Sequence, residues 1–206
     1  MAPNTFQVSD PAFTSTLAKL REDSSMRPAA VRSIVRQLTT MVAKDAITAP
    51  PPPGEKIAVI VILRSGLAMM EPFTDALPED TDMVIHHLGL FRERQTLQPI
   101  EYYNKLPAKA DNIKHAYILD PLVATGGTCC AAISILREWN IDSITFLCLV
   151  ASKAGLEKVS SAWPERTKVY VGAVDDGLDE KGFVKPGVGD IGDRLFGTGT
   201  DAGWSG

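Results

Sequence analysis

The segment from residue 116 to residue 139 constrains the fold more than any other part of the sequence. An apolar run over 116–119 ends at Asp120, a turn rich in glycine and threonine follows, and apolar residues then recur at helical spacing up to Trp139. A strand, a turn and a helix in this order form the building unit of an open α/β sheet. The first N–H groups of the helix and its dipole favour an anion at the turn. The segment therefore predicts a sugar-phosphate site, with Asp120 placed to accept hydrogen bonds from ribose hydroxyls.

The turn does not match the common nucleotide-binding loops. No lysine follows the glycines, as a P-loop requires, and the G-x-G-x-x-G dinucleotide fingerprint is absent. Glycines allow a phosphate to approach the backbone closely, and the two threonines add hydroxyl donors. The alternative is an ordinary strand-to-helix turn without a ligand. The predicted loop consists of Asp120, Pro121, Leu122, Val123, Ala124, Thr125, Gly126, Gly127 and Thr128.

The composition excludes several classes of protein. With 206 residues and a net charge of −4, the chain suits one α/β domain and has no overall positive field for nucleic acid. Its longest aliphatic run, 57–63, is far shorter than the ~20 residues of a membrane helix. Cys129, Cys130 and Cys148 lack the spacing of a metal site or of a disulfide framework. We therefore expect a cytoplasmic protein with free thiols and with neither a membrane nor a nucleic-acid partner.

Strand-like and helix-like apolar patterns alternate along the chain. The alternation predicts the α/β class, with a mainly parallel twisted sheet and helices on both faces. Residues 91–107 are rich in Arg, Gln and Tyr and predict a projecting arm. We expect one domain over 1–206, with flexible ends at 1–9 and 199–206. The predicted strands cover 57–63, 83–88, 116–119, 143–150 and 168–172, and the predicted helices begin near Pro11 and Pro28 or cover 67–77, 127–139 and 154–162.

Two arginines offer further anion contacts. Arg64 follows the first aliphatic strand and precedes Gly66, so it is expected at the carboxyl edge of the sheet, where ligands of open α/β sheets bind. Arg92 lies in the predicted arm and could bind pyrophosphate oxygens in a bidentate manner. The alternatives are a solvated loop arginine at position 64 and a charged hairpin, exposed or docked on another subunit, around position 92.

The segment 182–198 contains too many glycines for a helix or a regular strand. It predicts a folded loop whose accessible peptide groups could recognise the edge of a planar base. The alternative is a disordered tail, which large apolar residues such as Phe183, Ile191 and Phe196 argue against. We therefore expect a C-terminal hood over the carboxyl edge of the sheet.

The order of these motifs resembles one enzyme family. The arginine loop at 63–67 comes first, followed by the arm ending at Pro99 and the segment 102–107; the loop 120–128, the segment 175–179 and the glycine-rich segment 186–193 complete the pattern. Together, over residues 10–198, they resemble the uracil phosphoribosyltransferases. The chain departs from the family pattern at Phe183, where a tyrosine is expected, at 71–72, and in the longer tail after Thr198.

The resemblance implies transfer of the phosphoribosyl group of phosphoribosyl pyrophosphate (PRPP) to N1 of uracil, which gives UMP and pyrophosphate in pyrimidine salvage. It implies PRPP contacts from Arg64, Arg92, the loop 120–128 and Asp190, with catalytic roles for Asp120 and Asp190. It places uracil in the base-binding hood. It also implies Mg²⁺ held mainly by substrate and water, a homo-oligomer (dimer or tetramer) and a nucleotide effector such as GTP. The implied uracil contacts are Val184, Gly189, Asp190 and Ile191.

Three other functions stay open from the sequence. The first is transfer to another pyrimidine or to a purine, which the uracil-type pattern at 186–190 disfavours. The second is a regulatory RNA-binding protein on the same fold, which should carry a basic face that the acidic balance disfavours. The third is a catalytically silent member that only senses nucleotides.

Overall fold

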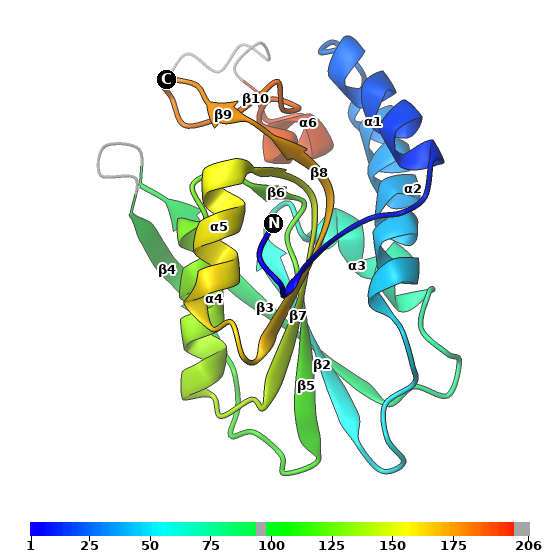
Figure 1. The fold of residues 1–206 in the computed structure, drawn as a ribbon, viewed down its shortest axis with the longest axis vertical. Helices are drawn as coiled ribbons and strands as arrows, with labels where there is room; N and C mark the ends of the chain where they lie inside the picture. The colour runs from blue at the N-terminus through cyan, green and yellow to red at the C-terminus, as the bar shows by residue number, and fades with distance from the viewer. Residues whose placement is uncertain (94–97, 200–206) are drawn as a thin grey trace.

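The computed structural model describes residues 1–93 and 98–199, and it forms one twisted sheet with helices on both faces (Figure 1). The predicted α/β class is confirmed. The strands are β1 (Thr5–Gln7), β2 (Lys56–Leu63), β3 (Met83–Arg92), β4 (Pro99–Asn104), β5 (Ile113–Leu119), β6 (Leu122–Val123), β7 (Ser143–Ser152), β8 (Thr167–Asp175), β9 (Gly177–Leu178) and β10 (Val184–Lys185). The helices are α1 (Ala12–Glu22), α2 (Pro28–Ala46), α3 (Leu67–Thr74), α4 (Gly127–Glu138), α5 (Lys153–Ala162) and α6 (Ile191–Phe196).

The main sheet has the strand order β1-β8-β7-β5-β2-β3-β4, and β6 pairs with β7. Every pairing is parallel except that of β3 with β4, which is antiparallel and forms the predicted arm. The central strand β2 is buried on both faces from Ile57 to Ile62, as its continuous aliphatic sequence predicts. Parallel strands align their carboxyl ends, so the loops after β2 and β5 meet at one edge of the sheet.

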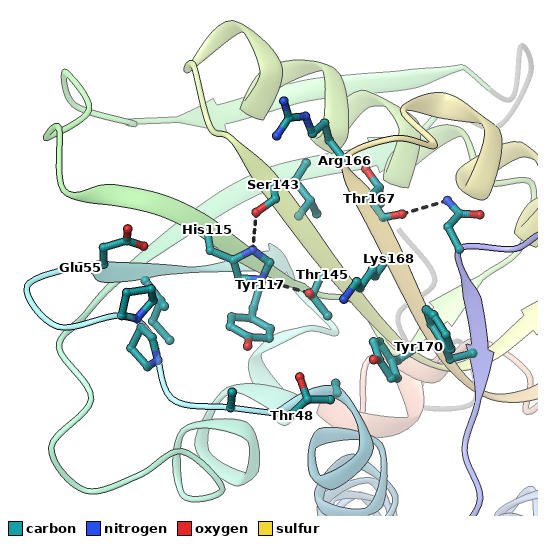
Figure 2. Close-up of a pocket in the computed structure, with 18 of the residues that line it drawn as sticks. Thr48, Glu55, His115, Tyr117, Ser143, Thr145, Arg166, Thr167, Lys168 and Tyr170 are labelled. Carbon is teal, nitrogen blue, oxygen red and sulfur yellow. Dashed lines mark hydrogen bonds between the residues drawn. The ribbon is translucent and has the colours of Figure 1, made fainter.

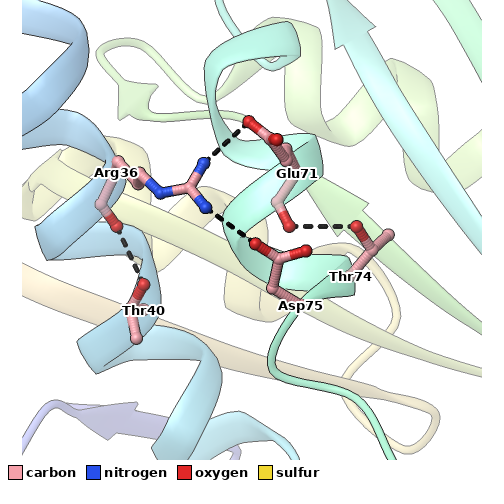
Figure 3. Close-up of polar contacts among 5 residues, drawn as sticks. All are labelled: Arg36, Thr40, Glu71, Thr74 and Asp75. Carbon is pink, nitrogen blue, oxygen red and sulfur yellow. Dashed lines mark hydrogen bonds and ion pairs between the residues drawn. The ribbon is translucent and has the colours of Figure 1, made fainter. Parts of the chain in front are cut away.

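Two hydrophobic cores lie on opposite faces of the sheet. Helices α1, α2 and α3 cover one face, and α4 and α5 cover the other (Figure 1). Arg36 on α2 binds Glu71 and Asp75 of the α3 segment, each at 2.7 Å, and links the two helices at the surface (Figure 3). Helix α3 ends at Thr74 rather than at the predicted residue 77, and tighter turns follow it, in which the N–H groups of Ala76 and Leu77 donate to the carbonyls three residues earlier.

The amino-terminal segment differs from the prediction. Residues 1–9 were expected to be flexible, yet Thr5–Gln7 forms β1 and pairs in parallel with β8. Phe6 also stacks on Tyr170, with ring centroids 5.0 Å apart. A strand of three residues is too short to show a periodic pattern, and its partner strand supplies the hydrogen bonds that order it.

The C-terminal segment contains a helix that its glycine content did not predict. Asp190 begins α6 by accepting a hydrogen bond from the N–H of Asp193, and Gly197 ends it in the left-handed conformation (φ 67°). With β9 and β10, α6 forms the hood above the carboxyl edge of the sheet (Figure 1).

Helix α1 anchors the hood to the rest of the domain. The guanidinium of Arg194 donates to the carbonyls of Leu20, Asp23 and Val188 at 2.7–2.8 Å. Arg21 binds both oxygens of the buried Asp175 carboxylate at 2.8 and 2.9 Å. The position of the hood therefore depends on residues in and just after α1, which precede the central strand β2 in the sequence. Within the described ranges, no helix is long and apolar enough to cross a membrane.

Candidate active site

A cavity of about 250 Å³ lies at the carboxyl edge of the sheet, beneath the hood. We call it the carboxyl-edge cavity. The loops after β2 and β5, the end of β3 and the hood all contribute to its lining. The predicted site residues that line it are Arg64, Asp120, Leu122, Ala124, Thr125, Gly126, Gly127, Thr128, Asp190 and Ile191.

Four predicted residues lie outside this lining. The carbonyl of Pro121 accepts the N–H groups of Leu149 and Val150, and Val123 is buried in β6, so both fix the loop to β7. Val184 is 3% exposed and packs in a core, and Gly189 serves the hood turn at φ 72°.

Arg92 ends β3, and the rest of the predicted arm tip lies beyond the described structure. The neighbouring Phe91 lines the cavity, so the backbone of β3 reaches the site. Pro99 begins β4, and its Cδ would lie 3.6 Å from a Cβ added at Gly127. The arm therefore starts beside the glycine-rich loop. The side chain of Arg92 and residues 94–97 are outside the described residues.

Asp120 is a carboxylate withdrawn from water. It is 6% exposed, and its Oδ1 accepts a long hydrogen bond of 3.3 Å from the Ser65 hydroxyl. Burial raises the pKa of Asp120 from an ordinary 3.8 to about 7, although the Leu122 N–H and the Ser65 hydroxyl oppose the shift. The Cys129 thiol lies 4.0 Å from the other oxygen. Few protein donors satisfy this carboxylate, so it retains capacity to accept hydrogen bonds from a ligand.

The glycine-rich loop packs against the amino end of α5, which fixes its position. The carbonyl of Ala124 accepts from the Ser152 hydroxyl at 2.6 Å, and the same hydroxyl caps α5 by accepting from the Gly155 N–H at 2.9 Å. A Cβ added at Gly155 would lie 2.2 Å from the Ala124 carbonyl oxygen, so only glycine permits this approach. The sequence analysis did not identify Ser152 or Gly155 as part of the site. Both residues lie far from the loop in the sequence, and no local pattern links them to it.

The amino end of α4 is open toward the cavity. Gly126 adopts the left-handed conformation (φ 74°) before the helix, and no side chain caps it. The N–H groups of the first turn and the helix dipole therefore point into a cavity that Thr125 and Thr128 also line. This arrangement suits a phosphate.

Arg64 faces the loop from the end of β2. Gly66 follows it in a position where a Cβ would lie 2.4 Å from the carbonyl oxygen of Leu119. This close packing brings the Arg64 turn against the end of β5. The guanidinium contacts Asp193 and Thr198 of the C-terminal segment, each at 3.1 Å. Neither Asp193 nor Ser65 was predicted as a site residue.

A second cavity of about 580 Å³ lies at the opposite, amino edge of the sheet (Figure 2). We call it the amino-edge cavity. His115 bridges Ser143 at 2.7 Å and Thr145 at 3.0 Å through its two ring nitrogens. Burial, and secondly the charge of Lys168, lower the pKa of His115 from 6.5 to about 4. Among the described residues that line it there is no glycine-rich turn and no helix amino end, in contrast to the carboxyl-edge cavity.

Comparison with known proteins identifies the family of the chain. Residues 52–198 match the family model of uracil phosphoribosyltransferase. The chain is 44% identical over 189 residues to a putative uracil phosphoribosyltransferase of Schizosaccharomyces pombe, covering 92% of this chain and 88% of that protein. It is 36% identical to a uracil phosphoribosyltransferase of a Roseiflexus species, covering 92% of this chain and 96% of the relative.

Solved structures share the architecture. A protein of Aquifex aeolicus superposes with a TM-score of 0.82 at 26% identity, covering 93% of this chain and 97% of that one. A hypoxanthine-guanine phosphoribosyltransferase of Bacillus anthracis superposes with a TM-score of 0.50 at 15% identity, covering 72% of this chain and 80% of that one, which shows a shared fold alone. The match over most of the chain leads to one conclusion: the chain belongs to the uracil phosphoribosyltransferase family.

Proposed function

We propose that this protein transfers the phosphoribosyl group of PRPP to N1 of uracil and releases UMP and pyrophosphate. One observation carries the proposal. The buried Asp120 carboxylate, the open amino end of α4 and the Arg64 guanidinium line a single cavity. This combination offers acceptors for ribose hydroxyls on one side and donors for phosphate oxygens on the other.

The 5′-phosphate would bind the loop 124–128, and the ribose hydroxyls would donate to Asp120. The pyrophosphate would lie toward Arg64, with Arg92 of the arm as a further proposed contact. In the reaction the anomeric carbon loses its bond to the pyrophosphate oxygen and gains a bond to uracil N1, while N1 loses its proton. Positive charge develops on the ribose ring and negative charge on the leaving group. Positioning and charge stabilisation would then supply most of the catalysis.

Mg²⁺ is part of the proposal as an ion held mainly by substrate oxygens and water. Among the described residues, no group of three or more His, Cys, Asp or Glu side chains could hold a metal by itself. This fits an ion that enters with PRPP, because Mg²⁺ often keeps several waters and uses one or two carboxylates. Asp120 and Asp190, which both line the cavity, are the carboxylates that would complete its shell. Such an ion would neutralise charge on the pyrophosphate.

Uracil would bind beneath the hood, next to Phe183, Asp190 and Ile191, which line the same cavity. Phe183 has no hydroxyl, so peptide groups would recognise the polar edge of the base. We propose that Val184 and Gly189 act through the backbone of the hood, because they adjoin Phe183 and Asp190, which line the cavity.

The remaining parts of the proposal concern the protein in the cell. A cytoplasmic location is supported by three free cysteines, two of them buried. A homo-oligomer, either a dimer or a tetramer, is supported by apolar side chains exposed on the arm, including Phe91 at 46% and Tyr102 at 54%. Regulation by a nucleotide such as GTP is a further proposal, taken from the family resemblance.

The test is conversion of radiolabelled uracil in the presence of PRPP and Mg²⁺, with UMP resolved from uridine and other nucleotides. Cytosine is the matched competitor, because its C4 amino group would meet a donor that waits for the uracil carbonyl. A site that reads this edge by hydrogen bonds can reject cytosine by ~10⁴-fold in kcat/KM. Comparable use of cytosine would contradict the assignment of uracil, and absence of any UMP would contradict the activity.

A further inference from the structure

Asp193 of the hood directs the guanidinium of Arg64. Its Oδ1 accepts a hydrogen bond from Arg64 Nη2 at 3.1 Å and another from the Thr198 hydroxyl at 2.6 Å. Thr198 in turn accepts from Arg64 Nη1 at 3.1 Å. Both terminal nitrogens of one arginine are thus bound by two side chains of the C-terminal segment.

These contacts leave part of the guanidinium available to a ligand. An arginine has five N–H donors, and the two hydrogen bonds to the hood use only two of them. The Arg64 side chain remains 52% exposed, and Arg64 lines the carboxyl-edge cavity. Asp193 and a bound anion can therefore contact the same guanidinium at the same time.

The same carboxylate belongs to the element that would cover the base. The N–H of Asp193 donates to the carboxylate of Asp190, the residue that caps α6. Asp190, Ile191 and Gly192 all line the carboxyl-edge cavity. At Gly192, an added Cβ would lie 3.3 Å from the Asp190 carboxylate and 3.8 Å from Arg64 Nη2. The hood and the arginine are in direct contact here.

We propose that Asp193 is a positioning residue that holds Arg64 toward the pyrophosphate of PRPP and connects the hood to the phosphate side of the cavity. The inference rests on the proposed function for the identity of the anion. It assigns Asp193 no contact with substrate. Because binding couplings are reciprocal, an ordered hood would favour PRPP, and bound PRPP would favour an ordered hood.

The experiment is a double-mutant cycle on PRPP binding, measured by calorimetry with the full chain. The four proteins are the wild type, D193A, R64A and the double variant. We expect D193A alone to raise the Kd for PRPP about fivefold, the upper range for a surface ion pair. In the R64A background, D193A should have no further effect, because its only route to PRPP is through Arg64.

Kinetics separate positioning from a general loss of structure. D193A should raise KM for PRPP with kcat almost unchanged, and D193N, which retains a carbonyl acceptor for Arg64, should recover part of the loss. D75N is the matched control, since Asp75, which follows α3, binds the exposed Arg36 of α2 at 2.7 Å and lies outside the carboxyl-edge cavity. It should leave KM unchanged.

Three results would overturn the inference: equal effects of D193A in both backgrounds, tighter PRPP binding by D193A, or an equal rise of KM in D75N. The binding cycle does not depend on turnover. A wild type that binds PRPP without making UMP would contradict the proposed function, and the cycle would still decide the role of Asp193. A wild type that does not bind PRPP would overturn both.

Discussion

The two edges of the sheet carry cavities that differ in how their polar groups are satisfied. In the amino-edge cavity, His115 uses both ring nitrogens for hydrogen bonds to Ser143 and Thr145. In the carboxyl-edge cavity, Asp120 receives two long side-chain hydrogen bonds, from Ser65 and Cys129, and the first turn of α4 has no side-chain cap. The smaller cavity therefore combines a buried carboxylate with an uncapped helix amino end. The larger cavity pairs its histidine, and the unpartnered atoms among its described lining residues include two neutral oxygens, Asn4 Oδ1 and Thr167 Oγ1.

The difference is the reason why we place the proposed reaction site in the smaller of the two cavities. The amino-edge cavity has about 580 Å³ against about 250 Å³ at the carboxyl edge. Buried polar groups that lack protein partners reduce stability, and a ligand that pairs with them recovers that free energy as affinity. The following predictions test this contrast, from the largest expected effect to the smallest.

Asp120→Asn should have the largest effect, because it should greatly reduce activity and yet increase stability at pH 8. Loss of the carboxylate removes the proposed ribose acceptor, so UMP formation should fall by roughly 10²-fold or more, or about 2–4 kcal/mol.

The stability contribution of Asp120 is present below its unfolded pKa of 3.8 and is lost as pH rises through about 7, since its folded pKa is raised. Asparagine cannot ionise, so the variant should be more stable than the wild type at pH 8. Urea titration at pH 5 and pH 8 measures this; normal activity in the variant would remove Asp120 from the site.

Arg64→Ala and Lys168→Ala compare cations at the two edges. Loss of charge-assisted hydrogen bonds to an anion costs about 1.5–3 kcal/mol, so Arg64→Ala should weaken PRPP binding roughly tenfold or more. Lys168 lines the amino-edge cavity, and its replacement should leave PRPP affinity unchanged. Calorimetric titration with PRPP gives both values. Equal losses would mean that net charge, rather than the site, governs binding.

His115→Gln should change the pH dependence of stability without changing activity. The folded pKa of His115 is lowered to about 4 from 6.5, so the folded state resists a proton that the unfolded chain accepts. The stability that this group contributes is present above pH 6.5 and is lost as pH falls to about 4, by up to roughly 2–3 kcal/mol. Unfolding curves of the variant should therefore fall less steeply with acid. Parallel curves for the two proteins would show that His115 does not cause the acid sensitivity.

Ser152→Ala should have the smallest effect. It removes the cap of α5 and the hydrogen bond to the Ala124 carbonyl. The loss of a helix cap costs about 1 kcal/mol, and the loop should also bind PRPP more weakly. Thermal unfolding and the Kd for PRPP measure the two effects. A change in stability with no change in affinity would limit Ser152 to a role in the fold.

Sequence patterns predicted the elements in which buried apolar residues are continuous or recur at regular spacing. The continuous aliphatic run of β2 and the stripe of α2 are examples, because a buried face leaves a regular trace in the sequence. The glycine-rich loop was also predictable, since its backbone conformation needs particular residues. The strand β1 was not, because its order comes from pairing with β8.

The site residues that the sequence did not reveal depend on contacts across the fold. Asp193 meets Arg64 across 129 residues, and Ser152 meets Ala124 across 28. No local pattern marks such pairs. Gly155 resembles any other helix glycine in sequence, and only the packing of the loop against α5 shows why a side chain cannot occupy its place. Binding features formed by consecutive residues can be predicted from the sequence. Features formed by residues far apart in the chain require the structure.

The anchoring of the hood by α1 has a consequence for how such a protein can diverge. The family model begins at residue 52, yet Leu20, Arg21 and Asp23 hold the hood through Arg194 and Asp175. Substitutions in this leading segment can stiffen or loosen the hood over the proposed base site while every residue that lines the carboxyl-edge cavity stays the same. The position of the hood can thus be adjusted from residues far in sequence from the proposed site, and a chain trimmed to the matched residues 52–198 would lose these contacts.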